Sequence, residues 1–199
     1  MQITVVDITE NPLVLIAKAA RVSHRSEESN LSSDKELVQK LVNWGHFSVL
    51  EAATATFLIE GISRACTHQL VRHRHLSFVQ ESLRYVGPMG DHIIPPSVAA
   101  SPPYNVKMKE LADNALALYQ EMVASGIPKE DARFILPIGT PTRIMVAGNF
   151  RAWREVIEKR GLNPHAQWEI KELLNEILTF LVAAAPVVFQ DLADSTRIR

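Results

Sequence analysis

The 199-residue sequence contains one cysteine, Cys66, so no disulfide can form within the chain. This scarcity is compatible with a reducing compartment, and we expect a cytoplasmic protein. A helix predicted over residues 62–72 would place Cys66 on the same side as Ile62 and Leu70. We therefore predict that the thiol packs in the core as a small apolar group and does not act as a nucleophile.

The sequence also lacks a strong charge excess and a membrane segment. Its formal net charge is −1 at pH 7, which gives no general attraction to nucleic acids or anionic membranes. Residues 1–4 show no basic region followed by an apolar run, so we expect no signal peptide. The most apolar late stretch, residues 180–189, is too short to span a bilayer and contains Pro186. Neither a nucleic acid nor a membrane is expected as a partner.

A glycine-rich phosphate loop is absent as well. The pattern Gly-x-Gly-x-x-Gly, with which many dinucleotide-binding folds hold a pyrophosphate, does not occur. Any flavin or nicotinamide would therefore be held by side chains and helix ends.

What is present is a mixture of strand and helix patterns without strict alternation, which favours an α+β fold in one domain over residues 1–199. Alternating apolar residues predict strands at 2–8, 54–60 and 142–147, and Gly61 is expected to end the second strand. Residues 23–30 and 88–103 are expected to be irregular, since they are rich in polar residues or in proline, glycine and serine.

Helices are predicted from their apolar spacing and their start and stop residues. Asn11 and Asn149 are expected as N-caps, a capping box at 33–36 should start another helix that ends at Gly45, and Asn163-Pro164 should start the last one. A further helix should carry Leu111, Ala115, Leu118 and Met122 on its buried stripe and stop at Gly126. The helix ranges expected are 12–22, 33–44, 62–72, a segment around 111–125, a short one from 128, 149–160, and one from 164.

The stretch from Arg72 to Tyr85 concentrates polar chemistry, with three arginines, two histidines and two serines in fourteen residues. The planar guanidinium can grip phosphates and other flat anions with two parallel hydrogen bonds. A solvated basic turn is the alternative. Interleaved aliphatic and aromatic residues, and the absence of glycine and proline before Gly87, favour a folded anion site.

The sequence offers two alternative kinds of site. His46, His68, His73 and His75 suggest a zinc hydrolase, but their spacing matches no familiar ligand pattern and the arginines would repel a dication, so no metal is expected. A nucleic-acid-binding module would need a broad basic surface, whereas here the basic cluster is local and the net charge is −1, so this kind of site is not expected.

The order Arg72-His73-Arg74, seven residues, Ser82, one residue, Arg84 resembles the signature of flavin-dependent thymidylate synthases. The similarity extends from Gly45 to Glu169 through the segments 45–51, 62–69, 132–137, 148–154 and 165–169. One departure is that four residues separate Arg160 from His165, where the family pattern has three. Glu155 and Leu83 also differ from the usual family residues, and for Glu155 a solvated helix glutamate is the alternative to a flavin contact.

The resemblance implies a methyltransferase that converts dUMP to dTMP, with FAD as cofactor and with NADPH and 5,10-methylenetetrahydrofolate as co-substrates. It also implies an antiparallel-type sheet packed with helices and a homotetramer whose sites are shared between subunits. Arg160 would lie against the uracil ring and stabilise negative charge on it. The residues implied for FAD are Ser48, Arg72, His73, Arg74, Gln80, Asn149, Phe150, Arg151 and Glu155. The residues implied for dUMP are Gln69, Leu70, Val71, Arg72, Gln80, Glu81, Ser82, Leu83, Arg84, Arg133 and Arg160.

Overall fold

The computed structural model describes residues 1–23 and 30–197, so most of the irregular segment expected at 23–30 lies outside the described residues. Contacts between Cα atoms group the chain into two compact units. The first unit comprises residues 1–2, 59–70 and 79–144, and the second comprises residues 3–58, 71–78 and 145–199. No helix in the described part of the chain is long and apolar enough to cross a membrane.

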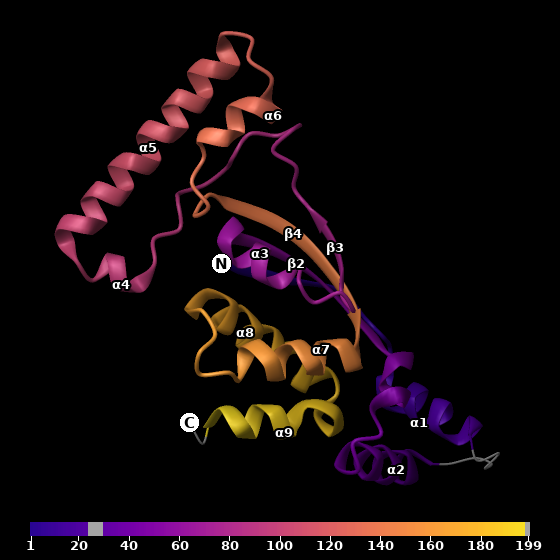
Figure 1. The fold of residues 1–199 in the computed structure, drawn as a ribbon. Coiled ribbons are helices and arrows are strands. Elements are labelled where there is room, and N and C mark those ends of the chain that lie inside the picture. The colour runs from indigo at the N-terminus through magenta and orange to yellow at the C-terminus, as the bar shows by residue number, and fades with distance from the viewer. Residues whose placement is uncertain (24–29, 198–199) are drawn as a thin grey trace. The chain divides into compact units, whose positions relative to one another are not determined.

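Within the described residues, one antiparallel sheet is formed in the strand order β1-β2-β4-β3. Figure 1 labels β2, β3 and β4 of this sheet. The strands are β1 (Gln2–Ile8), β2 (Thr54–Ser63), β3 (Ser77–Gln80) and β4 (Pro141–Asn149). The alternation predicted for β2 is confirmed, because Ala55, Phe57 and Ile59 are fully buried. The expectation that Gly61 ends this strand is wrong: Gly61 adopts a φ of 70°, which costs glycine little, and the strand continues to Ser63. The α+β class is confirmed.

The second unit contains α1 (Pro12–Val22), α2 (Leu31–Asn43), the 3₁₀ turn η1 (Phe47–Ala52), α7 (Phe150–Val156), the π turn η3 (Ile157–Gly161), α8 (Trp168–Ala184) and α9 (Pro186–Arg197). Helix α8 packs against both α9 and η3, while α1 packs against α2 and η1. The apolar core includes two edge-to-face aromatic pairs, Phe57 with Trp153 at 5.2 Å and Phe150 with Phe189 at 5.1 Å between ring centroids.

Helix ends in this unit follow local chemistry that the sequence indicated only in part. Asn149 caps α7 as predicted, since its Oδ1 accepts from the Ala152 N–H at 2.8 Å. Asn11 precedes α1 in a left-handed conformation and makes no side-chain cap. Helix α2 begins two residues before the predicted capping box, because Asn30 accepts from the Ser33 N–H at 3.0 Å. Asn163 does not start the long helix predicted from residue 164, which is α8; Gln167 caps it instead.

The first unit contains α3 (Arg64–Leu70), the short α4 (Pro96–Ala99), the long α5 (Pro102–Ala124), α6 (Lys129–Ala132) and the 3₁₀ turn η2 (Arg133–Ile135). Helix α5 packs against α4, α6 and η2. The stripe predicted for α5 is partly wrong: Ala112, Ala115 and Tyr119 are buried, whereas Leu111 and Leu118 are 65% and 42% exposed. Small alanines allow α5 to approach its neighbours closely, and the larger leucines are left outside.

Candidate active site

In the second unit, the loop after α3 and the π turn η3 bring two predicted site residues together. Arg160 Nε donates to His73 Nε2 at 3.4 Å. Burial lowers the pKa of His73, and the positive charges of Arg160 and Lys159 lower it further, against a smaller opposing effect of Glu155. His73 is therefore neutral near pH 7 and can accept this hydrogen bond. The structure thus places Arg160, predicted for dUMP, in contact with His73, predicted for FAD.

A hollow of about 530 Å³ lies beside this pair. It is lined by the loop residues 72–76 and by side chains of α7 and η3, namely Ala152, Glu155, Val156 and Lys159. No ion pair holds Arg72 or Arg74 among the described residues, whereas Lys159 pairs with Glu155. The loop thus presents two guanidinium groups at a concave surface, which suits an anionic ligand.

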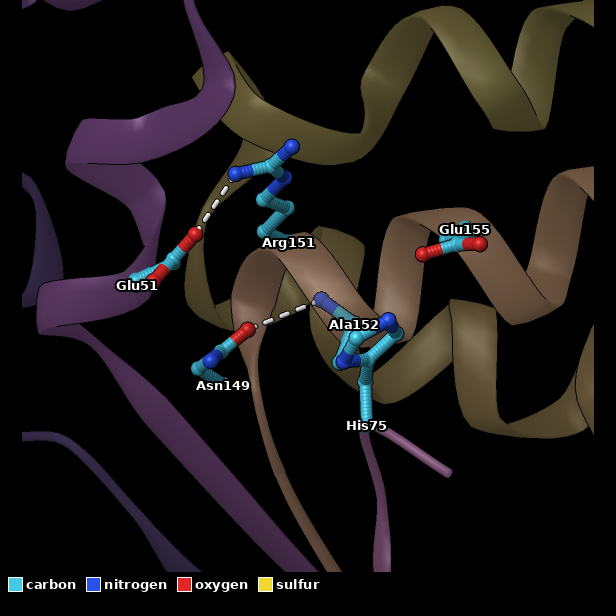
Figure 2. A pocket seen from close by; sticks show the side chains of 6 residues that line it. All are labelled: Glu51, His75, Asn149, Arg151, Ala152 and Glu155. Carbon is cyan, nitrogen blue, oxygen red and sulfur yellow. Dashed lines mark hydrogen bonds and ion pairs between the residues drawn. The ribbon is translucent and has the colours of Figure 1, made fainter. Parts of the chain in front are cut away.

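A second hollow, of about 480 Å³, shares His75, Ala152 and Glu155 with the first (Figure 2). Its other lining residues are Glu51, Asn149 and Arg151, and an ion pair of 2.6 Å joins Arg151 to Glu51. Because the Asn149 carboxamide caps α7, it is held in a fixed orientation at this wall. The two hollows bring six of the predicted cofactor residues to connected surfaces: Arg72, His73, Arg74, Asn149, Arg151 and Glu155.

Other residues predicted in the second unit have different surroundings. Ser48 is exposed on η1, and Val71 is exposed in the loop. The Phe150 side chain is fully buried, and its N–H donates to Ala53 O at 2.9 Å, so any ligand contact would come from other main-chain atoms. Six residues lining the hollows were not predicted as ligand contacts: Glu51, His75, Leu76, Ala152, Val156 and Lys159. Four of them lie within quoted segments and Lys159 adjoins Arg160, which was the available signal.

In the first unit, the predicted nucleotide segment leads from β3 into a turn. Ser82 O accepts from the N–H groups of Tyr85 and Val86 at 3.0 and 3.1 Å, which closes this turn. Arg84 Nε donates to Glu130 Oε2 at 2.7 Å, and Arg133 Nε donates to Glu130 O at 3.0 Å. The structure therefore brings Arg84 and Arg133 to one residue of α6. Glu130 was not predicted here.

The remaining predicted nucleotide residues of the first unit divide by burial. The Leu70 and Leu83 side chains are buried in the core. Gln69, Gln80 and Glu81 are half-buried, and Gln80 lies at the end of β3. Cys66 is fully buried, which confirms the predicted core position of the thiol.

The four histidines considered for a metal do not form such a site. Among the described residues, no group of three or more His, Cys, Asp or Glu side chains is arranged to hold a metal ion. His73 instead accepts from Arg160.

Comparisons with known proteins identify the family of this chain. Residues 4–187 match the model of the family described as thymidylate synthase complementing protein. The chain belongs to this family. It is 39% identical over 203 residues to a flavin-dependent thymidylate synthase of Geobacter sulfurreducens, covering 96% of this chain and 86% of that protein.

Two further relatives carry the same name. The protein from Mycobacterium bovis is 41% identical over 182 residues, covering 81% of this chain and 72% of its own length. The protein from Mycolicibacterium vanbaalenii is 38% identical over 208 residues, covering 92% of this chain and 83% of its own length. The resemblance inferred from Arg72 to Arg84 is thus confirmed.

Proposed function

We propose that this protein is a flavin-dependent thymidylate synthase that reductively methylates dUMP to dTMP. 5,10-Methylenetetrahydrofolate provides the carbon, and NADPH reduces the flavin. The observation that carries the proposal is the Arg160–His73 contact beside the arginine-lined hollow, in a chain of this family.

The residues of the second unit fit FAD. Its diphosphate needs cations, and Arg72 and Arg74 line the larger hollow without ion-pair partners among the described residues. We assign FAD to these two residues with Ser48, His73, Asn149, Phe150, Arg151 and Glu155 of the second unit. The family resemblance adds Gln80, which belongs to the first unit. Bound FAD supplies the hydride, and the protein supplies orientation and electrostatics.

We assign dUMP to Arg160 and to the segment preceding and including the turn at Ser82. Arg84 and Arg133 hold the 5′-phosphate, because both are oriented by Glu130 and retain terminal N–H groups for an anion. Arg160 faces the uracil and stabilises the negative charge that develops on the ring. The other nucleotide residues are Gln69, Leu70, Val71, Arg72, Gln80, Glu81, Ser82 and Leu83.

The protein acts as a homotetramer in which subunits share sites. Supporting this, Phe134 and Tyr85 are 85% and 74% exposed next to Arg133 and Arg84, which leaves apolar surface at the nucleotide segment for a second copy to cover. We place the enzyme in the cytoplasm, where nucleotide and reduced nicotinamide pools are available.

The test is reconstitution of the purified protein. It should be yellow, release FAD on denaturation, and form dTMP only when dUMP, methylenetetrahydrofolate and NADPH are all present. A colourless protein that does not bind added FAD and forms no dTMP would refute the proposal. Omission of each component in turn provides the control.

A further inference from the structure

A small polar cluster in the first unit surrounds the side chain of Gln80. Gln80 Nε2 lies 3.2 Å from Thr67 Oγ1 on α3 and 3.3 Å from Thr142 Oγ1 on β4. The two threonines are 0% and 5% exposed. Buried hydroxyls in a core cost free energy unless they are hydrogen-bonded, so this pair has a specific arrangement.

The hydrogen-bond directions in the cluster can be assigned from Thr67. Its single hydroxyl proton is donated to Arg64 O at 3.0 Å, so Thr67 Oγ1 can only accept from Gln80. The amide nitrogen of Gln80 must therefore face Thr67, and its second proton is available to Thr142. Both amide protons are used, and the carbonyl oxygen Oε1 points away from the threonines.

The main chain around Gln80 is held in the same way. Arg64 donates from Nη2 to Glu81 O at 3.1 Å, and the Glu81 N–H donates to Arg143 O at 2.9 Å. The Arg64 N–H donates in turn to Thr140 O at 3.1 Å. Helix α3 and strand β4 thus fix both the backbone and the amide orientation at this position.

We propose that Thr67 and Thr142 are positioning residues that make Gln80 a hydrogen-bond acceptor only. This inference rests on the proposed function, which places Gln80 against the nucleotide and the flavin. The atom that meets Oε1 is a donor. Three ligand groups qualify: the N3–H of uracil, the 3′-hydroxyl of deoxyribose and the imide N–H of the flavin. A ligand that offers an acceptor there leaves two acceptors facing each other and is rejected.

The experiment measures dissociation constants of the FAD-loaded enzyme for dUMP, N3-methyl-dUMP and 2′,3′-dideoxyuridine monophosphate, and the dissociation constant for FAD itself. The variants are T67V, T142V and their combination, which replace a hydroxyl by a methyl group of similar size, together with Q80M, which removes the acceptor. We expect the wild-type protein to bind about tenfold more weakly whichever ligand lacks the donor that Gln80 Oε1 accepts from. This discrimination should disappear in Q80M and in the valine variants, and T67S should restore it. If only the FAD constant responds, the donor is the flavin imide.

Variant T140V is the matched control, because Thr140 is a buried threonine of the same unit that donates to Pro137 O and does not contact Gln80. It should keep wild-type discrimination. The inference is overturned if the valine variants discriminate as the wild type does while Q80M does not, or if Q80M alters no ligand constant. A wild-type protein that binds neither FAD nor dUMP would overturn the proposed function together with the inference. That result differs from the two outcomes above, in which the wild type still binds its ligands.

Discussion

At Arg160, the hydrogen bond to His73 uses Nε and leaves the two terminal NH₂ groups of the guanidinium for a flat ligand. If Arg160 faces the uracil as proposed, negative charge that develops on the ring would make the interaction between Arg160 and the uracil stronger in the transition state than in the bound ground state. The sequence contained the arginine and the histidine but not their contact, because 87 residues separate them.

Replacing Arg160 by alanine should therefore slow the chemical step by roughly a hundredfold or more. Arg160→Lys keeps the charge without the planar fork and should recover only part of the rate. The measurement is single-turnover dTMP formation with prereduced FAD and saturating dUMP, which removes nicotinamide oxidation from the rate. Lys40→Ala, which removes an exposed cation of α2, is the control. Wild-type rates in Arg160→Ala would refute the role.

His73 gives the protein a stability that depends on pH. Burial, followed by Arg160 and Lys159, lowers its pKa in the folded state below the ordinary value of 6.5. Between the folded and the ordinary value, the unfolded chain binds more protons, so the free energy of unfolding falls as pH decreases through that window. For His73→Gln, the free energy of unfolding measured in urea titrations should fall less steeply over this range. Lys40→Ala, which removes an exposed cation of α2, should follow the wild type. If the free energies of unfolding of His73→Gln and the wild type change with pH in parallel, this prediction is contradicted.

At the scale of elements, long patterns were predictable and short ones were not. The bounds of β1 and α1 match the sequence prediction. Helix α8 buries an apolar stripe at helical spacing, formed by Ile170, Leu173, Ile177 and Leu181. Strand β3 and helix α4, at four residues each, offer too few residues for a period to be recognised. The secondary structure of such short segments is decided by contacts with residues far away in the sequence.

The π turn η3 explains how one extra residue is accommodated after Arg160. The Leu162 N–H donates to Ile157 O at 2.9 Å, five residues earlier, so this turn contains one residue more than an α-helical turn. The spacing from Arg160 to His165 exceeds the family pattern by one residue. The wider turn absorbs that residue while Arg160 still reaches His73.

Arg154 lies six residues before Arg160, and its contacts tie α7 to α9. It is 4% exposed, pairs with Asp191 at 2.6 Å, and lies 4.9 Å from the centroid of the Phe47 ring. We expect Arg154→Met to lower the free energy of unfolding by about 1.5–3 kcal/mol, since it removes charged hydrogen bonds. Urea unfolding measures this loss, and single-turnover rates of the folded variant should stay near wild type. Asp191→Asn, with a half-exposed side chain, should cost less.

At the scale of the whole molecule, the residues that the resemblance assigns to FAD and to the dUMP phosphate fall mostly in different units. Most FAD residues predicted by resemblance lie in the second unit, and the phosphate pair Arg84 and Arg133 lies in the first. Thr67 and Thr142 could not be predicted, since isolated threonines in a helix and a strand have no distinctive pattern. One domain over residues 1–199 remains a prediction beside the two compact units.

The proposed assembly can be tested on α5. Tyr104, Leu111 and Leu118 follow one another at seven-residue spacing and are 64%, 65% and 42% exposed, which is the pattern of a seam for a second helix. Introducing glutamate at both leucines would place two charges in such a contact, and desolvating them would oppose association. Light scattering should report a tetramer for the wild type and a smaller species for Leu111→Glu/Leu118→Glu, with helix content preserved in circular dichroism. Gln120→Glu adds charge at another exposed position of α5 and should remain tetrameric. A double variant with wild-type mass would show that this seam is not an interface, and a monomeric wild type would refute the tetramer itself.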